Sequence, residues 1–252
     1  MSFNVAAEAY DAFMGRWSRL LSSKLADFAD VHAGQRVLDV GCGTGALTSE
    51  LVERLGPENV SAVDPSEPFV TAMRARFPSM DVRQAPAEEL PYPDGAFDAA
   101  LSQLAVHFMN DPVAGLREMA RVTRPGGVVA ASVWDHAGQR GPLRDFWAAA
   151  RTIDPDVDDE SERAGTREGH LAELFGQAGL SEIESTALTV ELSHPTFEDW
   201  WEPFERGAGP AWAFVAGLDP ERRAALREEC RRRLSEGPVV ISAVAWAAQG
   251  QT

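Results

Sequence analysis

VLDVGCGTG, residues 37–45, is the stretch that decides the fold, and ALTSELVERL follows it at 46–55. The apolar run at 36–40 is typical of a buried strand, whereas the residues after the glycines favour a helix. A strand that turns through closely spaced glycines into a helix places backbone N–H groups at the carboxyl edge of a sheet. Ligands of open α/β sheets bind in the crevice at that edge.

Strands and helices alternate along the rest of the first 135 residues. Asp111 followed by Pro112 is typical of a helix start, with a capping side chain and proline in the first turn. Alternation of this kind predicts right-handed crossovers and a parallel sheet with helices on both faces. Further apolar runs predict strands at 60–63, 81–84, 97–101 and 128–134.

The second half of the chain changes character after Trp134. Two more strands are expected at 181–192 and 239–247, with helical pieces between them. We therefore expect an α/β fold, a three-layer sandwich whose seven-stranded, mostly parallel, Rossmann-like sheet has an antiparallel last strand. A single domain over 1–252 is expected, since a chain of this length can bury one sizeable core. A helical cap is expected from segments 1–30, 136–165 and 195–236.

Composition and charge exclude several classes of protein. Lys and Arg number 23 against 39 Asp and Glu, which leaves a net charge of −16. Such a field repels phosphate backbones and anionic lipid, so no nucleic-acid partner is expected, and no apolar run is long enough for membrane insertion. The two cysteines, Cys42 and Cys230, have no partner at metal-ligand spacing. We therefore expect no metal site and a cytoplasmic location.

Two aspartates at strand ends indicate what kind of ligand the crevice takes. Asp64 ends the second strand, where it can accept hydrogen bonds from two ribose hydroxyls, which implies a nucleotide-containing ligand. The spacing from Gly41 to Ala46 also satisfies a dinucleotide fingerprint, so the glycines alone do not separate cofactors. Asp39 precedes Gly41 by two residues, where it would repel a pyrophosphate but favour an ammonium or sulfonium group.

The motifs resemble those of a known superfamily. VLDVGCGTG (37–45) is similar to motif I of class I S-adenosylmethionine-dependent methyltransferases, and SAVDPS (61–66), AEELPYPDGAFD (87–98) and RVTRPGG (121–127) follow in the order of that superfamily. Together these ordered motifs are far more specific than any one alone. They most resemble the small-molecule branch that includes ubiquinone and menaquinone C-methyltransferases, the type 11 methyltransferase domain. The resemblance covers roughly residues 35–135.

The resemblance implies which residues hold the methionine and ribose parts of S-adenosylmethionine. Gly41, Gly43 and the adjoining backbone of Cys42 would cradle the methionine part. Asp39 would lie near its amino group. Asp64 would bind the ribose hydroxyls.

A second set of residues is implied for the adenine and the transferable methyl group: Pro65, Ser66, Ala87, Glu88, Ser102 and Gln103. Pro65 or Ser66 would border the adenine, and Ser102 with Gln103 would form the floor beneath the methyl group. The sequence departs from the common pattern at Pro86, where an Asp often precedes the Ala-Glu pair. Glu88 or a backbone carbonyl would then bind the adenine amino group instead.

Four further side chains have both a functional and a structural interpretation. Tyr10 could cover the cofactor and Arg16 could pair with its carboxylate, or both could simply pack at the N-terminus. His107 follows the fourth strand near the expected entry of an acceptor, where it could take a proton from a substrate hydroxyl. A packing role explains His107 equally well. His136 is a weaker candidate of the same kind.

Tryptophans are concentrated in the second half of the chain, where six of the seven lie after residue 130. They could form the core of the cap, line an apolar or aromatic acceptor pocket beneath it, or do both. We expect methyl transfer from S-adenosylmethionine, with S-adenosylhomocysteine as product, to a small molecule of apolar or aromatic character. An NAD-type oxidoreductase and a non-catalytic S-adenosylmethionine-binding module are the alternatives. The sequence does not indicate the acceptor, the atom methylated or the oligomeric state.

Overall fold

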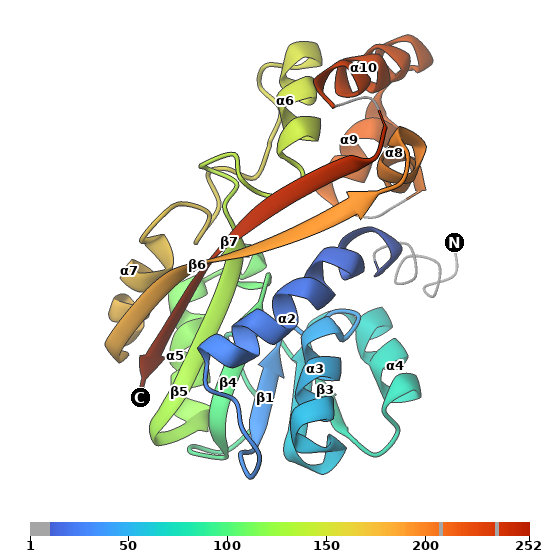
Figure 1. The fold of residues 1–252 in the computed structure, drawn as a ribbon. Coiled ribbons are helices and arrows are strands. Elements are labelled where there is room, and N and C mark those ends of the chain that lie inside the picture. The colour runs from blue at the N-terminus through green and yellow to red at the C-terminus, as the bar shows by residue number, and fades with distance from the viewer. Residues whose placement is uncertain (1–10, 207–208, 235–236) are drawn as a thin grey trace.

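The computed structural model describes residues 11–206, 209–234 and 237–252. Within these residues seven strands form one sheet in the order β3-β2-β1-β4-β5-β7-β6 (Figure 1). β7 runs antiparallel to both of its neighbours, which confirms the predicted mostly parallel sheet with an antiparallel last strand. The strands are β1 (Val37–Val40), β2 (Val60–Asp64), β3 (Asp81–Gln84), β4 (Phe97–Gln103), β5 (Thr123–Trp134), β6 (Ser181–His194) and β7 (Val239–Gln251).

Helices cover both faces of this sheet and produce the three layers (Figure 1). Successive residues of β1 point to opposite faces, so Val37 joins the apolar cluster beneath α3 whereas Leu38 joins the one beneath α5. Every residue of β1 is buried, as expected for a strand covered on both sides. One face carries α2 (Arg16–Phe28), α3 (Ala46–Leu55) and α4 (Glu67–Arg76), and the other carries α5 (Pro112–Val122) and α7 (His170–Ala178).

The predicted start of the helix after β4 is confirmed. Asp111 is the N-cap of α5, and its Oδ1 accepts a hydrogen bond of 3.0 Å from the Ala114 N–H. Pro112 occupies the first turn, where its missing N–H costs no hydrogen bond. A side-chain cap of this kind contributes about 1 kcal/mol to helix stability.

β6 and β7 continue past the rest of the sheet. β5 pairs with β7 as far as Trp134 opposite Ala245, whereas β6 and β7 stay paired as far as His194 opposite Val239. The resulting two-stranded ribbon reaches a group of helices at one end of the molecule (Figure 1), which are α6 (Arg144–Ile153), α8 (Phe197–Arg206), α9 (Pro210–Gly217) and α10 (Pro220–Arg233). These helices come from two of the segments expected to form a cap.

Aromatic packing holds this group of helices together. Phe146 of α6 stacks on Phe204 of α8, with ring centroids 4.4 Å apart and planes 4° apart. Phe13 meets Phe204 edge to face at 5.0 Å, so the N-terminal segment joins the same cluster. Further along that segment, Leu25 of α2 packs on the sheet instead. The same apolar cluster contains several buried tryptophans, among them Trp134, Trp147, Trp200 and Trp201. Tryptophans therefore form part of the core at this end of the molecule, which is one of the interpretations expected for them.

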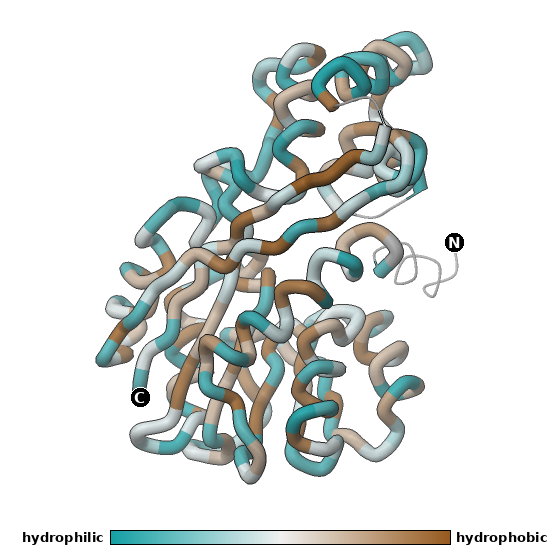
Figure 2. The backbone as a smooth tube through the Cα atoms, in the orientation of Figure 1, coloured by the Kyte–Doolittle hydropathy of each residue, from teal (hydrophilic) through white to brown (hydrophobic). Residues whose placement is uncertain are grey.

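α10 is hydrophilic along most of its length (Figure 2). Leu226 and Cys230 are its buried residues, and Arg231 forms an ion pair of 2.7 Å with Glu198 of α8. Arg233 at the end of the same helix pairs with Glu229 at 2.9 Å. No helix in the part of the chain that the structure describes has the length and apolar character needed to span a membrane.

Candidate functional site

The glycine turn after β1 lies at the carboxyl edge of the sheet. The Gly41 and Cys42 N–H groups both donate to the Val63 carbonyl, at 2.9 and 3.0 Å, which ties the turn to the end of β2. Gly41 has a φ of +76°, and a Cβ there would lie 2.4 Å from the Cβ of Ala105. Gly43 has a φ of +52° and open space where its Cβ would be. Both positions therefore favour glycine because of their positive φ, and Gly41 also requires it because a side chain would collide with the segment after β4.

A cavity of about 350 Å³ lies beside this turn, hereafter the larger cavity. Its lining includes the predicted residues Asp39, Gly41, Cys42, Gly43, Asp64, Pro65, Ser66, Ala87, Glu88 and Gln103. Its other lining residues are Ser18, Thr44, Ala46, Leu47, Phe69, Pro86, Leu104, Ala105, Phe108, Met109 and Asn110, of which the sequence analysis had assigned none to the ligand.

Asp39 lies at the end of β1 and is only 1% exposed. Its Oδ2 accepts a hydrogen bond of 2.6 Å from the Thr48 hydroxyl, while Oδ1 has no hydrogen-bond partner among the described residues. Burial, with added repulsion from Asp64, raises the pKa of Asp39 to about 7. Because a buried acceptor without a donor is costly, this oxygen fits a cationic or hydrogen-bonding group of a ligand.

Asp64 is held in one orientation by the backbone around it. Its Oδ2 accepts the Gly43 N–H at 2.9 Å and its Oδ1 accepts the Ser66 N–H at 2.8 Å. Burial raises the pKa of Asp64, and these two hydrogen bonds oppose that rise. Each carboxylate oxygen can accept a further hydrogen bond, so the side chain can still bind a pair of hydroxyls.

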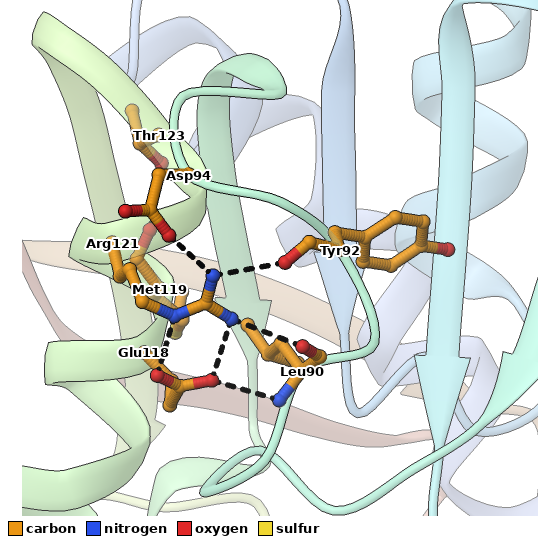
Figure 3. Close-up of polar contacts among 7 residues, drawn as sticks. All are labelled: Leu90, Tyr92, Asp94, Glu118, Met119, Arg121 and Thr123. Carbon is orange, nitrogen blue, oxygen red and sulfur yellow. Dashed lines mark hydrogen bonds and ion pairs between the residues drawn. The ribbon is translucent and has the colours of Figure 1, made fainter.

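The loop at 85–96 reaches the larger cavity and is held by Arg121 of α5 (Figure 3). The Arg121 guanidinium donates to the carbonyls of Leu90 and Tyr92, at 3.0 and 2.9 Å. It also forms a two-pronged ion pair with Glu118, whose Oε2 in turn accepts the Leu90 N–H at 3.0 Å. A buttress of this kind gives the RVTRPGG stretch a structural role in shaping the site.

Glu88 is the acid that this loop contributes to the larger cavity. Its Oε1 accepts the N–H groups of Asn110 and Asp111, at 2.8 and 3.1 Å. Glu88 thereby joins the loop to the start of α5. Pro86, at the position where the family pattern often has Asp, also lines the cavity.

Gln103 and Ser102 have different positions although they are neighbours in β4. The Gln103 Nε2 donates to the Ser18 carbonyl at 3.0 Å, and its buried Oε1 has no partner among the described residues. Ser102 is fully buried within the sheet and is not part of the cavity lining. The alternation of side chains along a strand accounts for the difference.

Of the two residues expected to form a lid, Arg16 is not among the described lining residues of the larger cavity. The Arg16 guanidinium donates to the Ser193 carbonyl at 3.3 Å and lines a separate small cavity with Trp17 and His194. Tyr10 lies outside the described residues. The described lining of the larger cavity consequently contains acids but no lysine, arginine or histidine.

Comparisons with known proteins agree with this geometry. Residues 38–131 match a family described as a methyltransferase domain. Malonyl-[acyl-carrier protein] O-methyltransferase of Serratia marcescens is 35% identical over 146 residues, which cover 58% of this chain and 56% of that protein, so the match spans about half of the relative. Nocamycin O-methyltransferase of Saccharothrix syringae is 29% identical, with 96% of this chain and 94% of that protein covered. A putative methyltransferase of Anabaena variabilis has the same fold, with a TM-score of 0.62 at 19% identity over 93% of this chain and 99% of that one.

The domain at residues 38–131 belongs to the class I S-adenosylmethionine-dependent methyltransferase superfamily. The residues of the larger cavity fit the cofactor of this superfamily. An unpartnered oxygen of Asp39 and the oriented carboxylate of Asp64 lie in its lining, and the backbone at Gly43 leaves open space.

A second cavity of about 50 Å³, the smaller cavity, shares Leu104 and Phe108 with the larger one. His107, His136 and Glu160 lie in it among apolar side chains. Burial, with the nearby charges of His136 and Arg163, lowers the pKa of His107 to about 3. A general base works best with a pKa near the working pH, so burial makes His107 a weak base.

Several further lining residues of the larger cavity have a signal in the sequence. Ala105, Phe108 and Asn110 follow the carboxyl end of β4, and that end meets the same sheet edge as the ends of β1 and β2. The rule that directed attention to Asp39 and Asp64 applies equally to this segment. Ser18 has no such signal, because it reaches the cavity from α2 through tertiary packing.

Proposed function

We propose that this protein transfers the methyl group of S-adenosylmethionine to a small acceptor. The observation that carries the proposal is the charge of the larger cavity, where Asp39, Asp64 and Glu88 meet no basic side chain among the described lining residues. S-adenosylmethionine presents a sulfonium and an ammonium group, both of which such a lining attracts. The pyrophosphate of NAD would be repelled there, which weighs against the oxidoreductase alternative.

Different residues of the larger cavity would bind different parts of the cofactor. Asp39 would accept a hydrogen bond from the ammonium group through Oδ1, the oxygen that Thr48 leaves free. Asp64 would accept from the ribose hydroxyls. Phe69 and Met109 supply apolar surface for the adenine.

Catalysis in this proposal rests on placement. When bound, S-adenosylmethionine supplies an already activated methyl group, so the protein has to align an acceptor atom with it and exclude water. Leu104 and Phe108 line both cavities and would therefore border the point where the acceptor meets the methyl group. Holding two reactants in contact can supply several kcal/mol of the barrier, about 7–11 in well-oriented intramolecular reactions.

The acceptor is proposed to be apolar or aromatic and to be methylated on oxygen. Phe13, Trp134 and Leu143 line the smaller cavity, which supports the apolar character. The names of two relatives, malonyl-[acyl-carrier protein] O-methyltransferase and nocamycin O-methyltransferase, support methylation on oxygen. The helices α6, α8, α9 and α10 are proposed to form the cap over this region. A cytoplasmic location is part of the proposal, in keeping with two buried free cysteines.

Isothermal titration with S-adenosylmethionine, S-adenosylhomocysteine and NAD tests the cofactor. Micromolar binding of the first two without binding of NAD is expected, and the reverse result would overturn the proposal. Release of S-adenosylhomocysteine across a panel of phenols, quinones, carboxylic acids and amines then tests the acceptor class. Binding of the cofactor without turnover of any acceptor in a broad panel would favour the non-catalytic module.

A further inference from the structure

We propose that His107, His136 and Glu160 form a binding site for a divalent transition metal ion of the zinc type. One potential ligand atom from each of these side chains lies within 4.8 Å of the others. The three residues come from separate segments: η3 (Val106–Phe108) after β4, the turn after β5, and the loop between α6 and α7. No spacing in the sequence indicates this grouping, because the fold alone brings the segments together.

The ligand set has the composition of an open metal site. Two imidazoles and one carboxylate suit Zn²⁺, Co²⁺, Ni²⁺ and Fe²⁺, whereas Mg²⁺ and Ca²⁺ prefer oxygen ligands alone. Catalytic zinc sites commonly have three protein ligands of this kind and leave further positions to water or substrate. Bonds of about 2.1 Å to a metal place neighbouring ligand atoms roughly 3.0–3.4 Å apart. The ligand atoms, which lie within 4.8 Å of one another, would therefore have to approach by at most about 1.8 Å, a shift on the scale of small side-chain rotations.

The surroundings favour a ligand over simple packing. His107, His136 and Glu160 are 9%, 8% and 4% exposed, and Nδ1 of His107 has no hydrogen-bond partner among the described residues. Buried polar atoms are normally hydrogen-bonded, so this nitrogen is available to bind a ligand that the described side chains do not provide. The smaller cavity, at about 50 Å³, has room for an ion with a bound water, since one water occupies about 30 Å³ in the liquid.

Glu160 is held in place at a cost in backbone energy. Its φ of +68° is in the left-handed region, which a non-glycine residue adopts only when its surroundings impose it. The Asp158 carboxylate accepts the Glu160 N–H at 3.0 Å, and Arg163 donates to the Glu160 Oε1 at 3.0 Å. Strained residues of this kind cluster at functional sites. A carboxylate has about four acceptor positions, so the bond from Arg163 leaves capacity for a metal.

The charges around the cluster permit a cation. Arg163 opposes one, but it also pairs with Asp158 at 3.1 Å. The other two acids near the cluster are paired as well, Asp135 with Arg140 and Asp159 with Arg151. Arg163 pairs with Glu160 as well, at 3.0 Å, so its single positive charge is shared by two carboxylates and an excess negative charge remains beside the cluster.

The position of the site gives it a consequence for catalysis, and this step rests on the proposed function. Leu104 and Phe108 line both cavities, so an acceptor oxygen bound to the metal would lie next to the methyl group of the cofactor. A divalent ion lowers the pKa of a bound hydroxyl, so the hydroxyl would release its proton to solvent without His107 acting as a base. The oxygen–methyl bond would then form as the methyl–sulfur bond breaks, and S-adenosylhomocysteine would leave. Metal binding itself does not depend on this step.

Titration of the metal-free full chain with Zn²⁺, against a chromogenic chelator, tests the site. One equivalent of Zn²⁺ should bind to the wild type, and Co²⁺ should bind with a visible absorption spectrum typical of nitrogen and oxygen ligands. His136→Ala and Glu160→Gln should each weaken Zn²⁺ binding at least tenfold. His194→Ala is the matched control, because His194 is also buried with both ring nitrogens unpartnered among the described residues but lies in a different cavity.

The outcomes separate this site from the proposed function. Absence of stoichiometric Zn²⁺ binding to the wild type, or equal binding by wild type and both cluster variants, would overturn the metal site. Thermal melts and S-adenosylhomocysteine titrations on every variant establish that it is folded, and Glu160→Gln keeps the shape of the side chain if His136→Ala fails that test. If the wild type does not bind S-adenosylhomocysteine, this result would instead count against the proposed function, whatever the result of the Zn²⁺ titration.

Discussion

The Thr48 hydroxyl donates a hydrogen bond of 2.6 Å to Oδ2 of Asp39, and this bond occupies one side of a carboxylate that is almost completely buried. Thr48 lies in the first turn of α3, so the helix that follows the glycine turn also fixes the acid that precedes it. The other oxygen of Asp39 has no partner among the described residues. The protein thus orients this carboxylate and leaves one acceptor for a ligand.

Cofactor binding should weaken as the pH falls below 7. Because the pKa of Asp39 is raised to about 7 in the ligand-free protein, the carboxyl becomes protonated below that pH and loses its attraction for an ammonium group. Affinity for S-adenosylhomocysteine at pH 6 should be up to about tenfold lower than at pH 8. Isothermal titration at both pH values measures this, and Asp39→Asn should remove the dependence. The same pH profile in wild type and variant would show that Asp39 does not contact the ligand.

The ligand-free protein should lose stability relative to Asp39→Asn as the pH rises from 4 to 7. The folded state holds the proton of Asp39 more tightly than the unfolded chain does, since its pKa rises from 3.8 to about 7 on folding. The contribution of this proton to the free energy of unfolding is therefore fully present below pH 4, and it is lost as the pH rises to the folded-state pKa of about 7. The difference in unfolding free energy between wild type and variant should change by about 2–4 kcal/mol across this range. Urea denaturation at pH 4.5 and 7.5 measures it, and a constant difference would contradict the burial argument.

Asp64→Ala should lower the affinity for S-adenosylhomocysteine by about 10–100-fold. The substitution removes the acceptor proposed for the ribose hydroxyls and releases the Gly43 and Ser66 N–H groups, and hydrogen bonds to a charged group are each worth about 1.5–3 kcal/mol. Asp81→Ala is the control, because Asp81 starts the neighbouring strand, pairs with Arg83 and is not part of the cavity lining. Unchanged affinity in Asp64→Ala would refute the ribose assignment.

Gly41→Ala should destabilise the protein and weaken cofactor binding. The new Cβ would lie 2.4 Å from the Cβ of Ala105, and the φ of +76° disfavours any L side chain. Gly34→Ala measures the cost of the positive φ alone, because Gly34 has a φ of +96° but open space around its Cβ position. We expect Gly41→Ala to cost about 1–3 kcal/mol more than Gly34→Ala in unfolding free energy. Combining it with Ala105→Gly should recover the steric part, and a purely additive double variant would exclude the contact as the cause.

Local patterns in the sequence predicted the part of the site that lies next to strand ends. Asp39, Asp64 and the glycine turn are determined by residues within a few positions of them, so their places follow from the strand–turn–helix pattern alone. Arg16 differs, because its partner Ser193 lies 177 residues away and is chosen by packing of α2 on β6. Glu160 differs again, because its approach to His107 depends on a left-handed backbone conformation within an acid-rich loop. Sequence patterns of strands and helices carry no information on either arrangement.

Arg121→Lys should loosen the loop at 85–96 and lower cofactor affinity without unfolding the protein. A lysine cannot reproduce the planar set of donors with which Arg121 reaches the carbonyls of Leu90 and Tyr92 together with Glu118 (Figure 3). Amide hydrogen exchange in this loop should become faster, and affinity for S-adenosylhomocysteine should fall by about 3–10-fold.

The matched control for this change is Arg117→Lys on the same helix. Arg117 is exposed, and its guanidinium donates to the Gln177 carbonyl at 3.3 Å, away from the loop. Arg117→Lys should leave both exchange and affinity unchanged. If Arg121→Lys accelerates exchange in the loop but leaves affinity as it was, the loop does not contact the cofactor, and the assignment of Ala87 and Glu88 to the adenine would be wrong. Slow exchange in both variants would show that other contacts, such as those of Glu88 with the start of α5, suffice to hold the loop.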